Sequence, residues 1–230
     1  MQAVILAAGR GTRMGTLVDD TPKPMLKIAG KTLLEHKFDA LPQDVDEIIL
    51  VVGYLADVIK ERYGHSYNGK KITYVTQENI VGGTMNALEQ ARELLKGRFF
   101  VMYADNVYAK KDMAMCIPFE GWVMVVEKRQ SLESLARVII DKDGLITDIV
   151  EADTHKGGPG LANTGLYLLD TQIFEYPAVT VRGRTETGLP QTMLQAKGRV
   201  PIHTVEATLF IEITNPHDIT KAEKALSKAV

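Results

Sequence analysis

Glycines and cationic side chains are concentrated in one loop near the start of the chain. In the stretch VILAAGRGTRMGTLVDDTPKPMLKIAGKTLLEH, an apolar run is followed by Gly9, Gly11, Arg13 and Lys23. Glycines let backbone N–H groups come close to an anion, and a guanidinium group can donate to two phosphate oxygens at once. The prolines on either side of Lys23 restrict the backbone, which lowers the entropic cost of fixing its ammonium group. The loop therefore predicts a site for a phosphorylated ligand.

Two common phosphate-binding motifs do not fit this loop. A dinucleotide-binding G-x-G-x-x-G would have Met14 at its third glycine, and the second expected strand ends in Gly53 instead of a ribose-binding acid. The residues 30–32 look like the end of a P-loop, but the glycine that this motif requires earlier is Met25. Both readings are therefore set aside.

The composition is that of an ordinary globular protein. The chain has 230 residues, of which 45% are hydrophobic and 24% charged. A formal net charge of -2 provides no basic field for nucleic acid or a membrane surface. The one cysteine, Cys116, excludes an internal disulfide, and the first apolar run is too short for a signal peptide or a membrane span. We expect a cytoplasmic protein that binds neither nucleic acid nor a membrane.

The first half of the chain alternates β-rich runs with helical patterns. Strands are expected at 4–7, 47–53, 70–77 and 98–105, and helices at 31–41, 55–64 and 84–97. Strands separated by helices of this length form βαβ units, so we expect a mostly parallel sheet. The ligand should lie where the strands end, at the opening loop and near Asp105.

Beyond about residue 112, strands predominate. They are expected at 122–128, 136–141, 145–152 and 161–170 and twice within 199–213, with a hairpin turn at 141–144 and helices at 171–176, 185–197 and 216–230. Linkers, low-complexity stretches and internal repeats are missing from the sequence. We therefore expect one α/β domain over residues 1–230.

The opening stretch, from Leu6 to His36, closely resembles the signature of the sugar-phosphate nucleotidyltransferases. That signature reads L-[AG]-[AG]-G-x-G-[ST]-R-[LM], then T-x-x-x-P-K-P-[ML]-[LV], then G-[KR]-P-[LM], and Thr32 replaces its last proline here. The resemblance implies a Rossmann-like nucleotide-diphospho-sugar transferase fold, with a mixed central sheet flanked by helices. It also implies a nucleotide-binding half at 1–110 and a sugar-phosphate-binding half at 111–230. Such enzymes join a nucleoside triphosphate to a sugar 1-phosphate, release pyrophosphate and use Mg²⁺.

The resemblance also places two metal-binding carboxylates. Asp105 ends an expected strand where the family has its first metal-binding Asp, although Ala104 replaces the glycine that usually precedes it. The late pattern W-x-D-I-G-T-P-x-D corresponds to FIEITNPHD, so Glu212 replaces the second Asp. Glutamate is one methylene longer and can still bind Mg²⁺. Asp105 and Glu212 are the predicted metal ligands.

Base recognition in the family uses a Gln after the third strand and a Gly at the start of the next helix. YVTQENIVGGTMNAL supplies Gln77, and either Gly82 or Gly83 fits the glycine position. A primary amide can donate to and accept from a pyrimidine edge. The resemblance implies that a Gln at this place favours uracil or thymine over guanine. The predicted nucleotide-binding set is Leu6, Ala8, Gly9, Gly11, Thr12, Gln77, Gly82, Gly83 and Thr84.

Sugar recognition in the family uses a Glu before a Lys-Pro and a later Asn-x-Gly. Glu151, Asn163 and Gly165 match these positions, and their carboxylate and amide groups suit hydroxyl recognition. Ala152 replaces the usual lysine, so an expected cation for the sugar's phosphate is missing, and Lys156 is a candidate substitute. The acceptor is therefore left open.

The remaining roles follow from the family's chemistry. We assign Arg13 to the β- and γ-phosphates and Lys23 to the phosphates at the reacting centre, with UTP or dTTP as the favoured donors. One alternative is a cytidylyl- or uridylyltransferase with a non-sugar acceptor such as phosphocholine, and another is a non-catalytic nucleotide-sugar sensor. No acyltransferase repeat follows the last expected helix, so one activity is expected. The sequence leaves the oligomeric state open, a homo-oligomer included.

Overall fold

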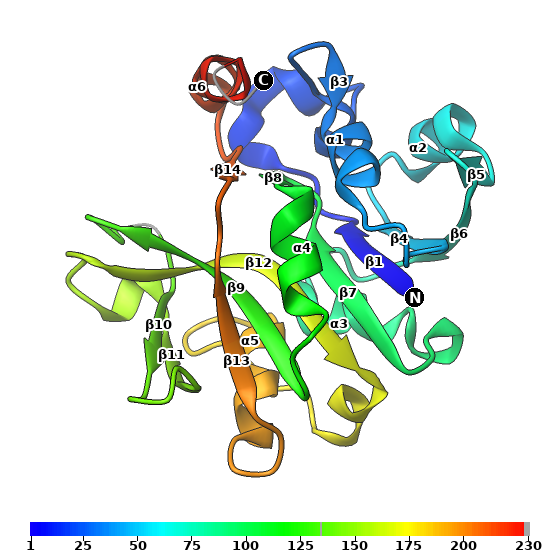
Figure 1. Ribbon diagram of the computed structural model, residues 1–230. Coiled ribbons are helices and arrows are strands. Elements are labelled where there is room, and N and C mark those ends of the chain that lie inside the picture. Colours follow the sequence, from blue (N-terminus) through cyan, green and yellow to red (C-terminus); the bar gives the residue numbers. More distant parts are fainter. Residues whose placement is uncertain (134, 228–230) are drawn as a thin grey trace.

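A mixed sheet runs through the whole molecule. The computed structural model describes residues 1–133 and 135–227. Eight strands follow the order β11-β10-β12-β7-β1-β4-β6-β5, and β9 joins the sheet by pairing with both β12 and β13 (Figure 1). Strands β1, β4, β6 and β7 pair in parallel, whereas β12 runs antiparallel to β7. The predicted mixed α/β fold, parallel in its first half, is confirmed.

The strands and helices have these bounds. The strands are β1 Gln2–Ala7, β2 Lys27–Ile28, β3 Lys31–Thr32, β4 Glu47–Val52, β5 Ser66–Tyr67, β6 Lys70–Thr76, β7 Arg98–Tyr103, β8 Asn106–Tyr108, β9 Trp122–Arg129, β10 Arg137–Ile140, β11 Ile146–Val150, β12 Gly160–Asp170, β13 Ile202–Glu206 and β14 Phe210–Glu212. The α-helices are α1 Leu33–Ala40, α2 Ala56–Tyr63, α3 Gly83–Glu89, α4 Lys110–Cys116, α5 Leu189–Met193 and α6 Pro216–Leu226. The 3₁₀ segments are η1 Thr12–Val18, η2 Lys23–Met25, η3 Arg92–Leu94, η4 Ala152–Thr154, η5 Thr171–Glu175 and η6 Leu194–Ala196.

Alternate residues of the central strands face two separate cores. Ile5 of β1 packs in one core with residues of α1, α2 and α4, and Val4 packs in the other with residues of α3 and α5. Successive side chains of a strand point to opposite faces, so a strand covered on both sides is apolar throughout. Figure 1 shows helices on both faces of the sheet. This explains the uninterrupted apolar runs of the first half.

A third, smaller core joins the two ends of the chain. Met14 and Val18 of η1 are buried with Leu33 of α1, Ile213 after β14 and Ala222 of α6. Figure 1 accordingly shows α6 beside the first part of the chain. Met14 is only 1% exposed, so a core residue occupies the position where a dinucleotide-binding motif would have its third glycine. After its glycines, the loop continues into the short 3₁₀ segment η1 and not into a long helix.

Helices are the least accurately predicted elements. The expected helix at 84–97 is split into α3 and η3, and the one at 185–197 begins only at Leu189, because the preceding segment is extended and bridges Thr180 to Thr187. Helix α4, seven residues long, is not predicted by the pattern at all. The last helix is expected to reach residue 230; α6 ends at Leu226, and residues 228–230 lie outside the described residues.

A buried carboxylate fixes the approach to β14. Asp112 of α4 is fully buried and accepts hydrogen bonds from the backbone N–H and hydroxyl of Thr208, at 3.0 and 2.6 Å, and from the backbone N–H of Leu209 at 3.4 Å. These residues connect β13 to β14. A buried carboxylate is tolerated only where donors satisfy its oxygens. The position of β14 therefore depends on Asp112.

We predict that Asp112→Ala lowers the free energy of unfolding by about 3 kcal/mol, because it leaves buried donors without an acceptor. For a chain of this size the melting temperature should fall by roughly 6–12 °C. Asp141→Ala is the matched control: its carboxylate also accepts two backbone N–H groups, in an exposed turn, and its loss should cost about 1 kcal/mol or less. Equal losses in thermal unfolding would contradict this account.

Candidate functional site

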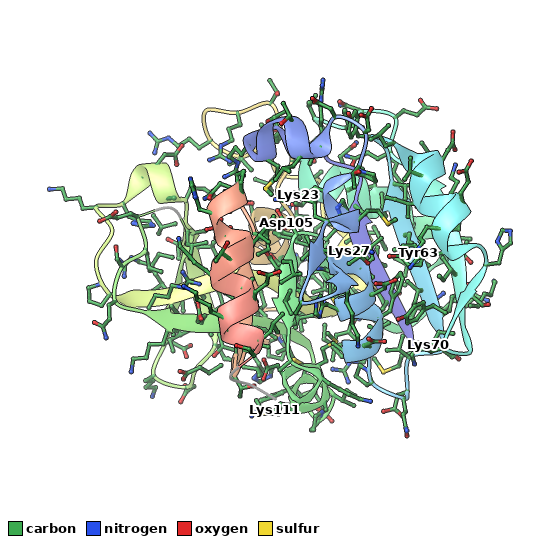
Figure 2. All side chains as sticks on the ribbon, turned by 90° about the horizontal axis from the view of Figure 1, so that it is seen from above. Lys23, Lys27, Tyr63, Lys70, Asp105 and Lys111 are labelled. Carbon is green, nitrogen blue, oxygen red and sulfur yellow. The ribbon has the colours of Figure 1, made fainter. Side chains whose placement is uncertain are left out.

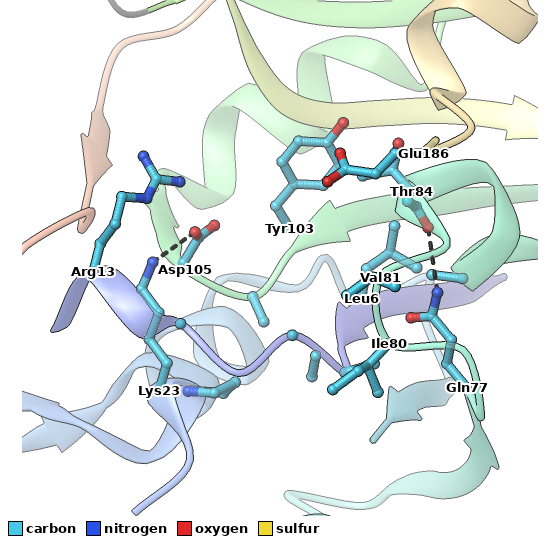
Figure 3. A pocket seen from close by; sticks show the side chains of 18 residues that line it. Leu6, Arg13, Lys23, Gln77, Ile80, Val81, Thr84, Tyr103, Asp105 and Glu186 are labelled. Atoms are coloured by element: carbon cyan, nitrogen blue, oxygen red, sulfur yellow. Dashed lines mark hydrogen bonds and ion pairs between the residues drawn. The ribbon is translucent and has the colours of Figure 1, made fainter. Parts of the chain in front are cut away.

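A cleft of about 350 Å³ opens at the carboxyl ends of the parallel strands (Figure 3). Strands β1 and β7 run in parallel side by side, so the loops that follow them meet at this edge. The predicted residues that line the cleft are Leu6, Ala8, Gly9, Gly11, Arg13, Lys23, Gln77, Gly83, Thr84 and Asp105. The predicted residues outside that lining are Thr12, Gly82, Glu151, Asn163, Gly165 and Glu212.

An ion pair at one end of the cleft joins the opening loop to β7. Lys23 Nζ lies 2.8 Å from Asp105 Oδ2, and the Lys23 side chain is 8% exposed. The lysine packs directly on Gly11, whose φ is +69° and where an added Cβ would lie 2.9 Å from Lys23 Cδ. Position 11 therefore requires a glycine, because the positive φ disfavours other residues and because a Cβ would collide with Lys23.

Arg13 stands beside this ion pair and points into the same end of the cleft (Figure 3). Arg13 lies in η1, and the buried side chain of the adjacent Met14 anchors this segment. Among residues 1–133 and 135–227, Arg13 forms no ion pair with a carboxylate. Its guanidinium is thus available to an anionic ligand, next to the buried ammonium of Lys23.

Glu212 lies next to Asp105 although it does not line the cleft. The two-stranded pairing of β8 with β14 puts Glu212 opposite Asn106, and the backbone N–H of Ile213 donates to the Asp105 carbonyl at 3.0 Å. Burial raises the pKa of the Glu212 carboxyl, and the negative charge of Asp105 raises it further. The two carboxylates are therefore close enough to repel each other.

Two neighbouring carboxylates beside the Gly-rich loop fit the requirements of Mg²⁺. This ion is usually held by one or two carboxylates, with the remaining ligands supplied by water and substrate phosphates. Across the described part of the chain, no group of three or more His, Cys, Asp or Glu side chains could hold a metal alone. Asp105 and Glu212 fit such a shared site, because a divalent cation would relieve their repulsion.

The opposite end of the cleft carries the amide of Gln77. Its Nε2 donates to Asn86 Oδ1 at 2.9 Å and to the Gly83 carbonyl at 3.4 Å, and the side chain is buried. With both amide hydrogens used in this way, the Oε1 oxygen is left to accept from a ligand. The apolar side chains of Ile80 and Val81 line the same end (Figure 3).

The structure separates the two adjacent glycines. Gly83 lines the cleft with a φ of +90°, and an added Cβ there would lie 2.4 Å from the Thr187 carbonyl oxygen, whereas Gly82 is the N-cap of α3. Thr187 clamps this turn: its N–H donates to the Gly82 carbonyl at 2.9 Å, and its carbonyl accepts from Met85 N–H at 3.0 Å. Gly83 is therefore the glycine that a bound base would meet.

Eight lining residues are absent from the predicted set, and two of them, Tyr103 and Glu186, carry polar side-chain groups. Tyr103, at the end of β7, stands between the two ends of the cleft, and Glu186 lines the end that carries Gln77 (Figure 3). Tyr103 reads as an ordinary strand residue, although an aromatic two positions before Asp105 is a usable signal. Glu186 lies in a polar loop, and the sequence offers no signal for it.

The predicted sugar-binding residues lie beyond Tyr103. Gly165 packs on the Tyr103 ring, and the hydroxyl of Tyr167 donates to Tyr103 Oη and to Asn163 Oδ1, both at 3.1 Å. Glu151 accepts from Gln191 Nε2 at 2.5 Å. These groups form a wall next to the cleft and are linked to it through Tyr103.

The basic residues of this wall are differently placed. Lys156 is exposed, and Arg137 donates to the carbonyls of Pro159 and Gly157, at 2.7 and 2.5 Å, so it secures the glycine-rich loop. The guanidinium of Arg184 lies 3.9 Å from both Glu151 and Asp153, the residues that flank Ala152. Arg184 thus places a guanidinium beside both residues that flank the position where the lysine is missing.

Comparison with known proteins identifies the family to which this architecture corresponds. Residues 2–191 match the sequence profile of the family described as nucleotidyl transferase. A heptose 1-phosphate guanylyltransferase of Campylobacter jejuni is 30% identical over 219 residues, covering 95% of this chain and 96% of the relative. A UTP–glucose-1-phosphate uridylyltransferase of Haloferax volcanii is 30% identical over 247 residues, covering 99% and 97%.

Other matches show the fold and a difference in length. The crystal structure of HddC from Yersinia pseudotuberculosis superposes with a TM-score of 0.74 at 27% identity and covers 98% of this chain and 99% of that one. The bifunctional protein GlmU of Methanococcus vannielii is 32% identical over 180 residues, which are 76% of this chain but only 42% of the relative. No helix among the described residues is long and apolar enough to cross a membrane.

We predict that Gly83→Ala weakens nucleotide binding at least tenfold, because the new methyl group would collide with the Thr187 backbone and displace the turn. Gly144→Ala is the matched control: its φ is +79°, but nothing lies within 4 Å of the added Cβ. Isothermal titration with UTP, dTTP or GTP, whichever binds the wild type most tightly, measures both. Unchanged affinity in the Gly83 variant would contradict the assignment.

Proposed function

The chain belongs to the nucleotidyl transferase family of enzymes, and on that premise we propose that it condenses a nucleoside triphosphate with a sugar 1-phosphate, releasing pyrophosphate. One observation carries the proposal. A single cleft has cations and a carboxylate at one end, Arg13, Lys23 and Asp105, and a base-sized end with a free amide acceptor, Gln77, at the other. This division matches the two chemically different ends of a nucleoside triphosphate.

The absence of a catalytic base from this proposal has a chemical reason. A sugar 1-phosphate is already an anion at neutral pH, so its oxygen can attack the α-phosphorus without losing a proton. The bond from the α-phosphorus to the bridging oxygen then breaks, and pyrophosphate leaves. Catalysis of such a transfer consists mainly of alignment and charge neutralisation. Cations and backbone N–H groups are sufficient for both.

Each side chain at the charged end has a separate task. Arg13 binds the β- and γ-phosphates and so stabilises the leaving pyrophosphate, and Lys23 binds the phosphates at the reacting centre. Asp105 and Glu212 would hold Mg²⁺, which supplies charge neutralisation between the two phosphorylated substrates. Lys23 is already fixed by its ion pair, so it needs little reorganisation when the substrates bind.

The base end favours nucleotides with a ring N–H beside a carbonyl. Gln77 Oε1 can accept from N3–H of uracil or thymine and from N1–H of guanine, whereas the corresponding ring nitrogens of cytosine and adenine are acceptors. Sites with a buried hydrogen-bonding group discriminate strongly against ligands that cannot pair with it. Uracil, thymine and guanine can therefore all pair with Gln77. We propose UTP or dTTP as the donor, because the resemblance to the family favours a pyrimidine at a Gln in this position. GTP is the second candidate, supported by the Campylobacter relative's guanylyltransferase name.

We predict pyrophosphate release when the purified protein is mixed with Mg²⁺, UTP or dTTP, and one member of a panel of sugar 1-phosphates. The five common nucleoside triphosphates are crossed with the panel, which includes glucose, heptose and amino-sugar 1-phosphates and phosphocholine. Turnover with GTP alone would select the second donor. Turnover only with CTP and phosphocholine would replace the sugar acceptor, and tight nucleotide-sugar binding without turnover would indicate a sensor.

We predict that Arg13→Ala lowers kcat by roughly 10²–10³-fold, the usual effect of removing a charged donor from a transition state. Arg10→Ala is the matched control from the same loop. The Arg10 guanidinium packs over the ring of Tyr54, 5.2 Å from its centroid, and its side chain is not among those that line the cleft. We expect less than a threefold change in the control; a similarly small change in the Arg13 variant would remove Arg13 from the mechanism.

A further inference from the structure

A fully buried lysine lies behind the charged end of the cleft. Lys37 of α1 has no solvent exposure, and its ammonium group donates to the backbone carbonyl of Asn106, the residue that follows Asp105. The ammonium nitrogen also lies 5.7 Å from the centroid of the Tyr108 ring. No carboxylate of the described chain pairs with it. Lysine is rarely buried completely without such a partner, so its presence here requires an explanation.

Asn106 connects this lysine to the sugar-side wall. Its side-chain amide donates to the Thr164 carbonyl at 2.9 Å and to Tyr108 Oη at 3.1 Å. The Tyr108 hydroxyl donates to the same Thr164 carbonyl at 2.9 Å. Thr164 stands between Asn163 and Gly165, at the point where the pairing of β12 with β9 is irregular. A continuous buried chain thus runs from α1 through Asn106 to the segment that carries the predicted sugar ligands.

Asn106 is also adjacent to both predicted metal ligands. Asn106 follows Asp105 directly, and it is the β8 partner of Glu212. Its backbone carbonyl, which accepts from Lys37, therefore lies at the start of β8, directly after Asp105 and opposite Glu212. The environment of Lys37 is electrostatically unfavourable: burial lowers the pKa of its amine to about 7, although the charge of Asp105 raises it. An apolar residue of similar volume would be the more stable choice at such a position.

We infer that Lys37 is a positioning residue for the proposed reaction: through the Asn106 carbonyl it fixes the start of β8, which follows Asp105 and pairs with Glu212 of β14, relative to the segment 163–165. The inference rests on the proposed function for its catalytic consequence. Groups that orient metal ligands without touching the metal typically change metal affinity or activity by 10–100-fold when removed. A residue with only a packing role would change stability instead.

The test compares Lys37→Met with Lys70→Met. Lys70 is a matched control because its amine also donates to backbone carbonyls, those of Pro42 and Val45, and burial also lowers its pKa. It lies well away from Lys23 and Asp105 (Figure 2). Three quantities are measured: the melting temperature, the affinity for Mn²⁺ by electron paramagnetic resonance in the presence of the nucleotide that the wild type binds, and kcat.

For Lys37→Met we expect an equal or higher melting temperature, Mn²⁺ affinity about tenfold weaker, and kcat at least tenfold lower. For Lys70→Met we expect a lower melting temperature with unchanged Mn²⁺ affinity. Mn²⁺ affinity and kcat within twofold of the wild type in the Lys37 variant would overturn the inference. Tighter Mn²⁺ binding would overturn it too, because it would mean that the lysine acts only through its charge.

Two further variants keep the test decisive if Lys37→Met does not fold. Lys37→Gln retains an N–H donor without the charge and should bind Mn²⁺ more nearly as the wild type does. Asn106→Leu breaks the link to Thr164, and its effect on kcat should be non-additive with that of the Lys37 substitution; strict additivity would contradict a shared network. Mn²⁺ binding is read without turnover, so a wild type that binds Mn²⁺ but releases no pyrophosphate would refute the proposed function alone.

Discussion

The ion pair between Lys23 and Asp105 is the interaction around which the site is organised. The two residues are 82 positions apart, and their contact holds the opening loop against the carboxyl end of β7. The lysine can reach the carboxylate because Gly11 leaves room for its stem, and because η1 is anchored beneath by Met14. The Lys23 side chain is shielded from water, whereas that of Asp105 is 36% exposed, so the pairing has to offset mainly the desolvation of the lysine. Both partners, moreover, face a cleft where anionic substrates and a cation would compete for them.

The structure builds each end of the cleft with elements from both parts of the chain. The charged end needs β14, which arrives from the C-terminal part and brings Glu212 beside Asp105. The base end needs Thr187, which clamps the turn before α3. Lys37 and Asn106 connect the charged end, through the interior, to the segment around Thr164. The cleft is therefore a product of long-range packing, although most of its lining residues lie in the first half of the sequence.

The sequence is most informative where backbone requirements leave few choices. Parallel strands buried on both faces appear as unbroken apolar runs, and the residue types of the Gly-rich loop alone predict that Arg13 and Lys23 share one site; both residues line the cleft. The order of strands, the split of the helix after Gly83 and the clamp by Thr187 depend on distant contacts, which local patterns do not encode. Lys37 is detectable in principle, because it lies on the same face of its helix as the apolar Leu33, Leu34 and Phe38.

The Thr187 clamp has a consequence for the order in which the protein becomes functional during synthesis. Its hydrogen bonds join residues 101 to 105 positions apart, so closing them has a substantial loop-closure entropy. A growing chain that has emerged only as far as α4 contains Gln77, Gly83 and most of the lining, yet lacks the segment that holds the Gly83 turn in place. The clamp on the Gly83 turn can therefore form only after about a hundred further residues have been synthesised. Nucleotide binding would then be acquired in one late step, when residue 187 docks, and would not increase gradually as the chain lengthens.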